Sequence, residues 1–282
     1  MSPNQLPELL VEPLVRAALL EDLGPSGDVT TDAVIPTGLT YRARLNARAS
    51  GVVSGVQLAR LAFRLVDPGL SLNVLRPDGS HVQSGDTVME IEGAASSILM
   101  AERVALNFAG RLSGIATLTA AFVAETSGTQ ARITCTRKTT PGLRLVEKQA
   151  VRHGGGSPHR FGLSDAILIK DNHIAAAGGI SKALGAARKS AGHMRRIEIE
   201  VDTLAQLDEV LGTGGADVVL LDNMGTQTLR AAVAKVAGRL VTEASGNMSH
   251  ARIAEVAATG VDYISVGALT HSAPVLDLGL DF

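Results

Sequence analysis

The sequence has very little cysteine and few aromatic residues, and each scarcity excludes a class of protein. Its 282 residues include one cysteine, no tryptophan and 2% aromatic residues. A single cysteine, Cys135, excludes an intramolecular disulfide and a cysteine-based metal cluster, and it is compatible with a reducing compartment. The scarcity of aromatic side chains removes the stacking platform that single-stranded nucleic acids need. We therefore expect an aliphatic core, with Cys135 as a small buried side chain.

Long apolar runs and an excess of one charge are missing as well. No apolar stretch reaches the roughly 18 residues that suggest a membrane-spanning helix, and residues 1–10 lack the basic start and apolar run of a secretory signal. The formal net charge is -2, which argues against a nucleic-acid-binding protein. We expect a cytoplasmic protein that binds neither a membrane nor nucleic acid.

The first third of the chain predicts local, antiparallel pairing. Residues 40–48 (TYRARLNAR) alternate between apolar and polar side chains, which is typical of a half-buried strand. Residues 70–75 and 87–92 predict two more short strands, with a turn at 82–86. Residues 57–66 predict a helix, so this part of the chain is expected to form an α+β module.

Helices are predicted on both sides of this module. Residues 8–23 predict an amphipathic helix, residues 27–32 a loop, and residues 95–126 two helices that break at Ser113 and Gly114. The buried face of the first helix is expected to carry four apolar side chains: Leu10, Leu14, Ala18 and Leu19.

After Gly128 the pattern changes to strands that alternate with helices, which implies parallel strands. The expected strands are 132–136, 166–170, 196–202, 217–222, 240–244 and 263–266. The expected helices are 181–191, 204–211, 228–237 and 250–258. Polar residues close successive strands, which favours a β/α barrel over a doubly wound sheet. A seventh strand is expected around 114–120 or in the loop after Gly142.

The segment from Arg132 to Lys170 is strongly basic within a mildly acidic chain. It holds eight Lys/Arg and only two acids, a balance of +6. A triple glycine, 154–156, lets the backbone approach a ligand closely. Basic side chains at strand ends beside such a loop suit a small polyanion with carboxylate or phosphate groups.

Acidic and small residues at other strand ends complement these cations. Glu200 and Asp222 could hold Mg²⁺ through water or bind ribose hydroxyls, and the loops at 245–247 and 267–268 could offer backbone N–H groups to a phosphate. Glu198 lies on the same strand face as Glu200 and is expected to pair with a basic neighbour such as Lys170. Arg103, read alone, predicts a surface ion pair with Glu102 or another neighbour.

Several long motifs, in this order and spacing, resemble the quinolinate phosphoribosyltransferase family, whose members are also called carboxylating nicotinate-nucleotide pyrophosphorylases. The resemblance extends from about residue 20 to the C-terminus. The motifs are EDLGPSGDVTT (21–31), AERVALN (101–107), TRKTTPG (136–142), GGGSPHRFGLSD (154–165), IKDNH (169–173), EIEVDT (198–203), LLDNM (220–224) and EASGN (243–247).

The resemblance implies an α/β fold with an N-terminal α+β sandwich at 1–113 and an incomplete, seven-stranded parallel β/α barrel at 114–271. The tail at 272–282 is expected to return to the first domain. The implied enzyme is a pentosyltransferase of NAD biosynthesis. It joins quinolinate to phosphoribosyl pyrophosphate (PRPP) with Mg²⁺ as cofactor, and releases pyrophosphate and CO₂ to give nicotinate mononucleotide.

The resemblance also implies roles for individual residues. The residues expected to contact quinolinate are Arg137, Lys138, His159, Arg160 and Lys170, and Thr136 is a further expected substrate-binding residue. The residues expected to hold the 5′-phosphate are Ser245, Gly246, Asn247, Val266, Gly267 and Ala268. The catalytic set is Lys138, Lys170, Glu200 and Asp222. Glu200 and Asp222 are the implied metal ligands, directly or through water, and Arg103 is implied to complete the neighbouring site in a homodimer or a larger oligomer.

Two other functions stay open on the sequence. One is a paralogue of the same fold, associated with molybdate transport, that uses a different phosphoribosyl acceptor or none. The other is a barrel that binds an anionic ligand without catalysis. A Rossmann-like phosphoribosyltransferase is disfavoured, because its PRPP loop needs two adjacent acids and Asn223 follows Asp222 here.

Overall fold

The computed structural model describes residues 5–282, and the chain divides into two compact units. Unit 1 consists of Met1–Ala120, Thr139–Gly155 and Leu269–Phe282, and unit 2 of Ala121–Lys138 and Gly156–Ala268. Residues 1–4, at the start of the expected N-terminal domain, lie outside the described range. The domain boundary predicted at residue 113 falls inside a single long helix. Residues Thr139–Gly155, which the sequence assigns to the barrel, belong to unit 1 in the structure.

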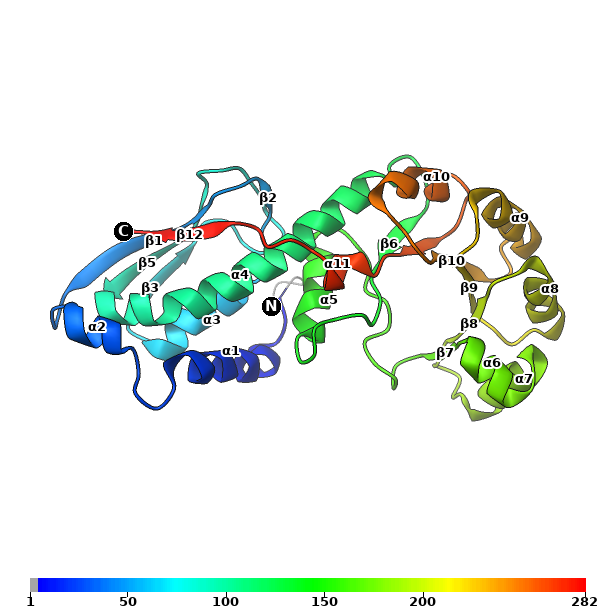
Figure 1. Cartoon of the computed structure of the whole chain (residues 1–282), viewed down its shortest axis with the longest axis horizontal. Helices are drawn as coiled ribbons and strands as arrows, with labels where there is room; N and C mark the ends of the chain where they lie inside the picture. The colour runs from blue at the N-terminus through cyan, green and yellow to red at the C-terminus, as the bar shows by residue number, and fades with distance from the viewer. Residues whose placement is uncertain (1–4) are drawn as a thin grey trace. The chain divides into compact units, whose positions relative to one another are not determined.

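Unit 1 is built on an antiparallel sheet in the order β12-β1-β5-β3 (Figure 1). Its strands are β1 (Thr40–Ala47), β3 (Ser71–Val74), β5 (Thr87–Ala94) and β12 (Leu278–Asp281), and a separate pair is formed by β2 (Gly51–Val52) and β4 (His81–Val82). Ala43, Leu45 and Ala47 are buried along β1, which confirms the expected half-buried strand. β12 pairs with β1, with Leu280 opposite Leu45, so the C-terminal tail completes this sheet.

Helix α1 (Glu8–Leu23) has the expected bounds, but the predicted buried face was only partly right. Leu19 is buried as expected, together with Val11 and Val15, whereas Leu14 and Ala18 are partly buried and Leu10 is 51% exposed. Rows of apolar residues run along two neighbouring faces of this helix, so periodicity alone does not choose between them. Packing against α3 (Val56–Val66) makes the choice.

The loop predicted at 27–32 is instead the start of a short helix, α2 (Val29–Val34). Asp28 is its N-cap, because one carboxylate oxygen accepts the backbone N–H of Thr31 at 3.0 Å. An aspartate in this position satisfies a backbone donor that would otherwise lack a partner. The hydrogen bonds from Thr31 hold the pKa of Asp28 below its ordinary value.

Helix α4 (Ala95–Ala124) is one helix of 30 residues, so the predicted break at Ser113 and Gly114 was wrong. A Cβ placed on Gly114 would lie 1.8 Å from the backbone oxygen of Pro274. The glycine therefore serves a close approach of the C-terminal segment. α4 is also the one described helix long and apolar enough to cross a membrane, with a hydropathy of 1.2 over its best window, but 56% of that window is buried within the protein, as in a core helix.

Unit 2 contains a six-stranded parallel sheet in the order β6-β11-β10-β9-β8-β7 (Figure 1). Its strands are β6 (Arg132–Thr134), β7 (Ile167–Ile169), β8 (Ile197–Val201), β9 (Val218–Asp222), β10 (Val241–Ser245) and β11 (Tyr263–Ser265). All six strands predicted in this part of the sequence are present. The first strand, β6, pairs with the last, β11, and β6 and β7 form the two edges of the sheet.

The expected seventh strand does not form in either proposed place within the described chain. Residues 114–120 belong to α4, and the segment after Gly142 forms α5 (Arg144–His153). Along the outer edge of β6, the backbone N–H of Ser157 instead donates to the carbonyl of Ile133 at 2.8 Å. The α/β class, with a sheet domain followed by a parallel-stranded domain, is confirmed.

Helices follow the strands of unit 2. They are α6 (Asp171–Ala177), α7 (Ile180–Ser190), α8 (Leu204–Thr213), α9 (Thr226–Val236), the 3₁₀ turn η1 (His250–Arg252) and α10 (Ile253–Ala257). The core is aliphatic, as predicted, and Cys135 is buried within it. α6 was not predicted, because its first turn, Asp171 to His173, has the polar composition of a strand end. The short helix α11 (Ala268–His271) leads to the C-terminal segment.

Candidate active site

The carboxyl ends of the six parallel strands in unit 2 carry most of the residues that the sequence singles out. Because the strands are parallel and adjacent, these ends share one edge of the sheet. The residues found there are Thr136, Arg137 and Lys138 after β6; Lys170 after β7; Glu200 in β8; Asp222 in β9; Ser245, Gly246 and Asn247 after β10; and Val266, Gly267 and Ala268 after β11. This edge is the candidate active site.

A carboxylate cluster lies at the ends of β8 and β9. Oxygen atoms of Glu200, Asp202 and Asp222 all lie within 4.8 Å of one another. The ammonium group of Lys170 donates to Glu200 at 2.8 Å, so one cation partly offsets three negative charges. Oxygen ligands at this spacing match the chemistry of a hard divalent cation such as Mg²⁺.

The loops after β9 and β10 interlock beside this cluster. The side-chain amide of Asn223 donates to Asp222 at 2.6 Å, and its backbone N–H donates to the carbonyl of Ser245 at 3.0 Å. Asn223 and Asn247 both adopt positive φ, 53° and 48°, which few residues other than glycine do. A Cβ on Gly246 would lie 2.1 Å from the Asn223 side chain. Glycine is therefore required here, and Asn223 is a site residue that sequence reasoning missed.

His159 lies between two buried glutamates. Its Nε2 is 3.2 Å from Glu198 of β8 and 3.6 Å from Glu243 of β10. Glu198 is 7% exposed and Glu243 is 5% exposed. Sequence reasoning missed Glu243, although it begins the EASGN motif. The sequence feature that could have identified it is a charged residue, Glu243, in the middle of a strand whose other residues are expected to be buried.

Glu198 faces a basic neighbour, as expected, but this neighbour is His159 and not Lys170. Lys170 pairs with Glu200, and His159 faces Glu198. The reason is position along β8: Glu200 lies two residues nearer the carboxyl end of the strand, where Lys170 precedes α6, whereas Glu198 lies deeper in the sheet.

Arg160 is a partly buried cation in the same loop as His159. One of its guanidinium nitrogens donates to the carbonyl of Ala166 at 3.0 Å. Burial lowers the pKa of Arg160, and the positive charge of Arg137 lowers it further, while Glu198 and Asp165 oppose the shift. Two guanidinium groups close enough to repel each other favour an anionic ligand, whose binding relieves that repulsion.

The loop that carries Arg160 is fixed by Asp165. Its carboxylate accepts the backbone N–H groups of Phe161 and Gly162 at 2.5 and 3.0 Å. Burial would raise the pKa of Asp165, but these hydrogen bonds and the charge of Arg160 outweigh burial and lower it. The carboxylate therefore stays ionised and holds the loop closed on itself.

The remaining cations of the basic segment have structural or solvated positions. Arg132 and Arg152 are exposed, Lys148 is fully buried, and Arg144 donates to the hydroxyl of Thr139 at 2.9 Å. Only part of the basic segment therefore contributes to the candidate site.

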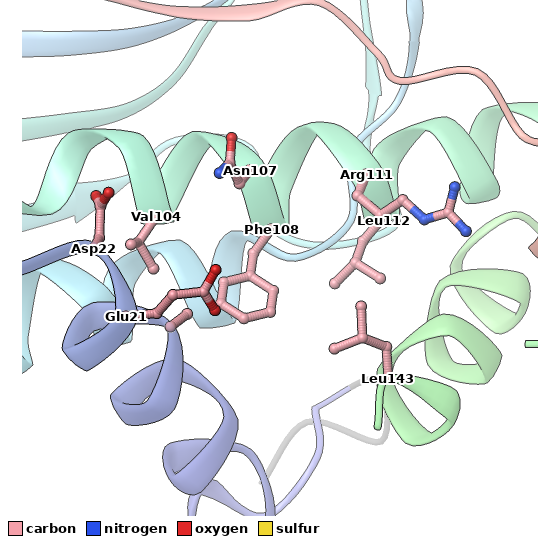
Figure 2. Close-up of a pocket in the computed structure, with 9 residues that line it drawn as sticks. Glu21, Asp22, Val104, Asn107, Phe108, Arg111, Leu112 and Leu143 are labelled. Carbon is pink, nitrogen blue, oxygen red and sulfur yellow. The ribbon is translucent and has the colours of Figure 1, made fainter. Parts of the chain in front are cut away.

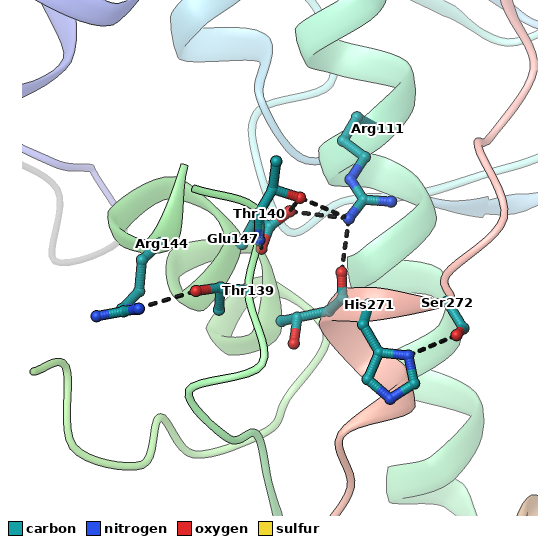
Figure 3. Close-up of polar contacts among 8 residues, drawn as sticks. Arg111, Thr139, Thr140, Arg144, Glu147, His271 and Ser272 are labelled. Carbon is teal, nitrogen blue, oxygen red and sulfur yellow. Dashed lines mark hydrogen bonds and ion pairs between the residues drawn. The ribbon is translucent and has the colours of Figure 1, made fainter. Parts of the chain in front are cut away.

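Unit 1 holds its own polar network, centred on Arg111 of α4 (Figure 3). One guanidinium nitrogen donates to Glu147 at 2.8 Å, to the carbonyl of Thr270 at 2.6 Å and to the hydroxyl of Thr140 at 3.3 Å. Glu147 is fully buried. This network ties α4, α5 and α11 together and anchors the segment that follows Lys138 in the sequence.

Arg103 lies on α4 in unit 1, where its side chain is exposed. Among the described residues Arg103 and Glu102 form no ion pair, because adjacent residues of a helix such as α4 point in different directions. The nearby cavity of about 310 Å³ contains none of the expected substrate-binding residues (Figure 2). Its lining is formed by Ala18, Glu21, Asp22, Val104, Asn107, Phe108, Arg111, Leu112 and Leu143.

Comparisons with known proteins agree over nearly the whole chain. Family models match at residues 28–113 (quinolinate phosphoribosyl transferase, N-terminal domain) and 115–281 (quinolinate phosphoribosyl transferase, C-terminal domain). A relative from Mycobacterium leprae, the nicotinate-nucleotide pyrophosphorylase [carboxylating], is 44% identical over 95% of each chain. The Nicotiana tabacum quinolinate phosphoribosyltransferase [decarboxylating] 1b is 42% identical over 99% of this chain and 84% of its own length.

Solved structures give the same result. NadC from Streptococcus pyogenes superposes with a TM-score of 0.95 at 41% identity, covering 99% of this chain and 98% of that one. The nicotinate-nucleotide pyrophosphorylase from Francisella tularensis gives 0.94 at 38% identity, with the same coverage. The two family models together, and each of these relatives, span the sheet domain and the parallel-stranded domain. The chain therefore belongs to the quinolinate phosphoribosyl transferase family.

Proposed function

We propose that this chain is a cytoplasmic pentosyltransferase of NAD biosynthesis that transfers the phosphoribosyl group of PRPP to quinolinate. The reaction releases pyrophosphate and CO₂ and forms nicotinate mononucleotide. The observation that carries the proposal is the edge of the parallel sheet, where Arg137, Arg160 and Lys170 accompany the carboxylates of Glu200 and Asp222. The activities named for the M. leprae and tobacco relatives support the same reaction.

The cations of the site suit the acceptor. Quinolinate carries two carboxylates, and guanidinium groups bind carboxylates through paired, charge-assisted hydrogen bonds. The positive charge of Arg137 lies close enough to lower the pKa of Arg160, so an anion between the two guanidinium groups is favoured. In this proposal Arg137, Arg160, Lys138 and Lys170 bind the acceptor, with Thr136 beside them.

The carboxylates suit the donor. As pyrophosphate leaves C1 of the ribose, positive charge develops at that carbon, and the pyridine nitrogen of quinolinate attacks it. Glu200 and Asp222 offer fixed negative charge to this state. The loops of Ser245–Asn247 and Val266–Ala268 would hold the 5′-phosphate through backbone N–H groups, as the last two loops of many barrels do.

Decarboxylation then follows from the product of transfer. The new bond leaves the ring nitrogen positively charged, and this charge stabilises the carbanion that remains at C2 when CO₂ departs. A proton from solvent completes nicotinate mononucleotide. No protein nucleophile is required, so the mechanism consists of binding, orientation and electrostatic stabilisation.

The donor set of the carboxylate cluster fits the expected Mg²⁺. Glu200 and Asp222 would hold the ion, directly or through water, and when bound it would neutralise the pyrophosphate leaving group. We expect removal of divalent cations with EDTA to abolish nicotinate mononucleotide formation, and added Mg²⁺ to restore it. Undiminished turnover in EDTA would contradict the metal requirement.

A homodimer or larger oligomer is part of the proposal, with Arg103 of one subunit completing the site of another. Two variants test it, Arg103→Ala and Lys170→Ala, each expected to lose at least about tenfold in kcat/KM. When the two are co-expressed with different tags, each mixed dimer contains one intact site. Random assembly should then recover about a quarter of wild-type activity. Additive residual activities would contradict a shared site.

The decisive experiment for the function is a direct assay of the purified protein with quinolinate and PRPP. We expect equal amounts of nicotinate mononucleotide, pyrophosphate and CO₂. Binding of both compounds in calorimetry without CO₂ release would instead favour an anion-binding protein. Turnover with another acceptor, and none with quinolinate, would favour the transport-associated paralogue.

A further inference from the structure

Two buried glutamates lie beneath the acceptor cations, and the proposed reaction assigns them no role. Glu198 and Glu243 come from β8 and β10, which are separated by β9. At the level of Glu243, β9 contributes the apolar Leu220. Two buried carboxylates in an otherwise aliphatic sheet are costly to maintain without partners. We call this pair the carboxylate floor.

The hydrogen bonds of His159 determine where its ring proton lies. The backbone N–H of Arg160 donates to Nδ1 of His159 at 2.8 Å, so Nδ1 must offer a lone pair. In a neutral ring the proton is then on Nε2. Nε2 lies 3.2 Å from Glu198 and 3.6 Å from Glu243. The carboxylate floor therefore accepts the ring N–H.

The same geometry argues against a metal ion in this cluster. Ligand atoms of His159, Glu198 and Glu243 lie within 4.8 Å of one another, which is close enough for a shared cation. However, a metal ion would bind the lone pair of Nε2, whereas the lone pair of Nδ1 already accepts the backbone N–H of Arg160. Neither ring nitrogen could then carry a proton, so the histidine would have to be an imidazolate anion. The nearby guanidinium group of Arg160 also disfavours a second cation.

The carboxylate floor also acts on Arg160. The charge of Glu198 stabilises the protonated guanidinium group. Two buried atoms have no hydrogen-bond partner among the described residues: Oε1 of Glu198 and Nε of Arg160. Glu198 therefore places negative charge next to the guanidinium group of Arg160. Arg160 follows His159 in the same loop, and its backbone N–H donates to the His159 ring.

We propose that Glu198 and Glu243 are positioning residues. They hold His159 as its Nε2–H tautomer, and His159, through the backbone N–H of Arg160, holds the Arg160 guanidinium group in place for a carboxylate of the acceptor. Both ring nitrogens of His159 then bind protein groups, so Arg160 contacts the acceptor and His159 orients it. This inference rests on the proposed function for the identity of the acceptor.

Glu198→Gln is the test, because glutamine keeps the length of the side chain and removes its charge. We expect KM for quinolinate to rise about tenfold and KM for PRPP to change less than about twofold. The matched control is Glu255→Gln, an exposed glutamate of α10, which should leave both constants unchanged. An unchanged KM for quinolinate in an active Glu198→Gln enzyme would overturn the proposal.

A spectroscopic readout keeps the test independent of turnover and of the variant's folding. In wild-type protein with ¹⁵N-labelled histidine, the His159 ring, assigned by loss of its signals in His159→Gln, should show a proton on Nε2 and none on Nδ1. A proton on Nδ1 would overturn the inference. If wild-type protein shows this tautomer but no activity with quinolinate, the proposed function fails and the positioning of His159 stands.

Discussion

Glu200→Gln is expected to lower kcat by about 10²–10³-fold, the range seen when a preorganised group that stabilises transition-state charge is removed. The side chain keeps its length and loses its charge at the place where positive charge develops on the ribose. Glu200 is half-buried and lies within 4.8 Å of Asp202 and Asp222. Single-turnover measurement of nicotinate mononucleotide formation reports the chemical step directly.

The chain supplies a matched control for this variant. Lys235 and Asp208 form an ion pair at 2.8 Å, the same length as the pair between Lys170 and Glu200, on exposed helix surfaces away from the strand ends. Asp208→Asn should leave kcat unchanged, because an exposed ion pair contributes at most about 1 kcal/mol to stability. A Glu200→Gln enzyme with kcat within about twofold of wild type would remove Glu200 from the catalytic set.

The strands of unit 2 could be predicted because a buried parallel strand has a strong local signal. β7 and β9 are short apolar runs that lead into Lys170 and Asp222, and all six predicted strands are present. Parallel order then brings Lys170, Glu200 and Asp222 to one edge, although they are far apart in the sequence. The regular spacing of the strands thus predicts which side chains share this edge of the sheet.

The contacts within the site could not be predicted in the same way. Glu198 faces His159 because a loop folds back over the sheet, and no local pattern specifies where a loop places its side chains. Glu243 was missed for a related reason: a single acid in an apolar strand becomes informative only when its partner from another segment is known.

Gly114 shows how tertiary packing can reverse the meaning of a residue. In the sequence, a serine and a glycine within a long apolar stretch favour a break between two helices. In the structure, α4 continues through this point and the backbone of Pro274 lies against the glycine. The missing side chain makes room for a segment that is distant in the sequence, and the tail beyond that contact forms β12.

Gly114→Ala is therefore expected to destabilise unit 1 by about 3 kcal/mol, although alanine normally favours a helix. The new Cβ would lie 1.8 Å from a backbone oxygen, and backbone cannot rotate away as a side chain can. The C-terminal segment must move, which weakens the pairing of β12 with β1. Chemical denaturation should report the loss of stability, and faster hydrogen exchange at Leu280 should locate it.

Gly185→Ala in α7, where a Cβ meets nothing within 4 Å, should instead stabilise by about 0.5–1 kcal/mol. If both substitutions changed the stability by the same amount, the contact between residue 114 and Pro274 would not have the expected destabilising effect.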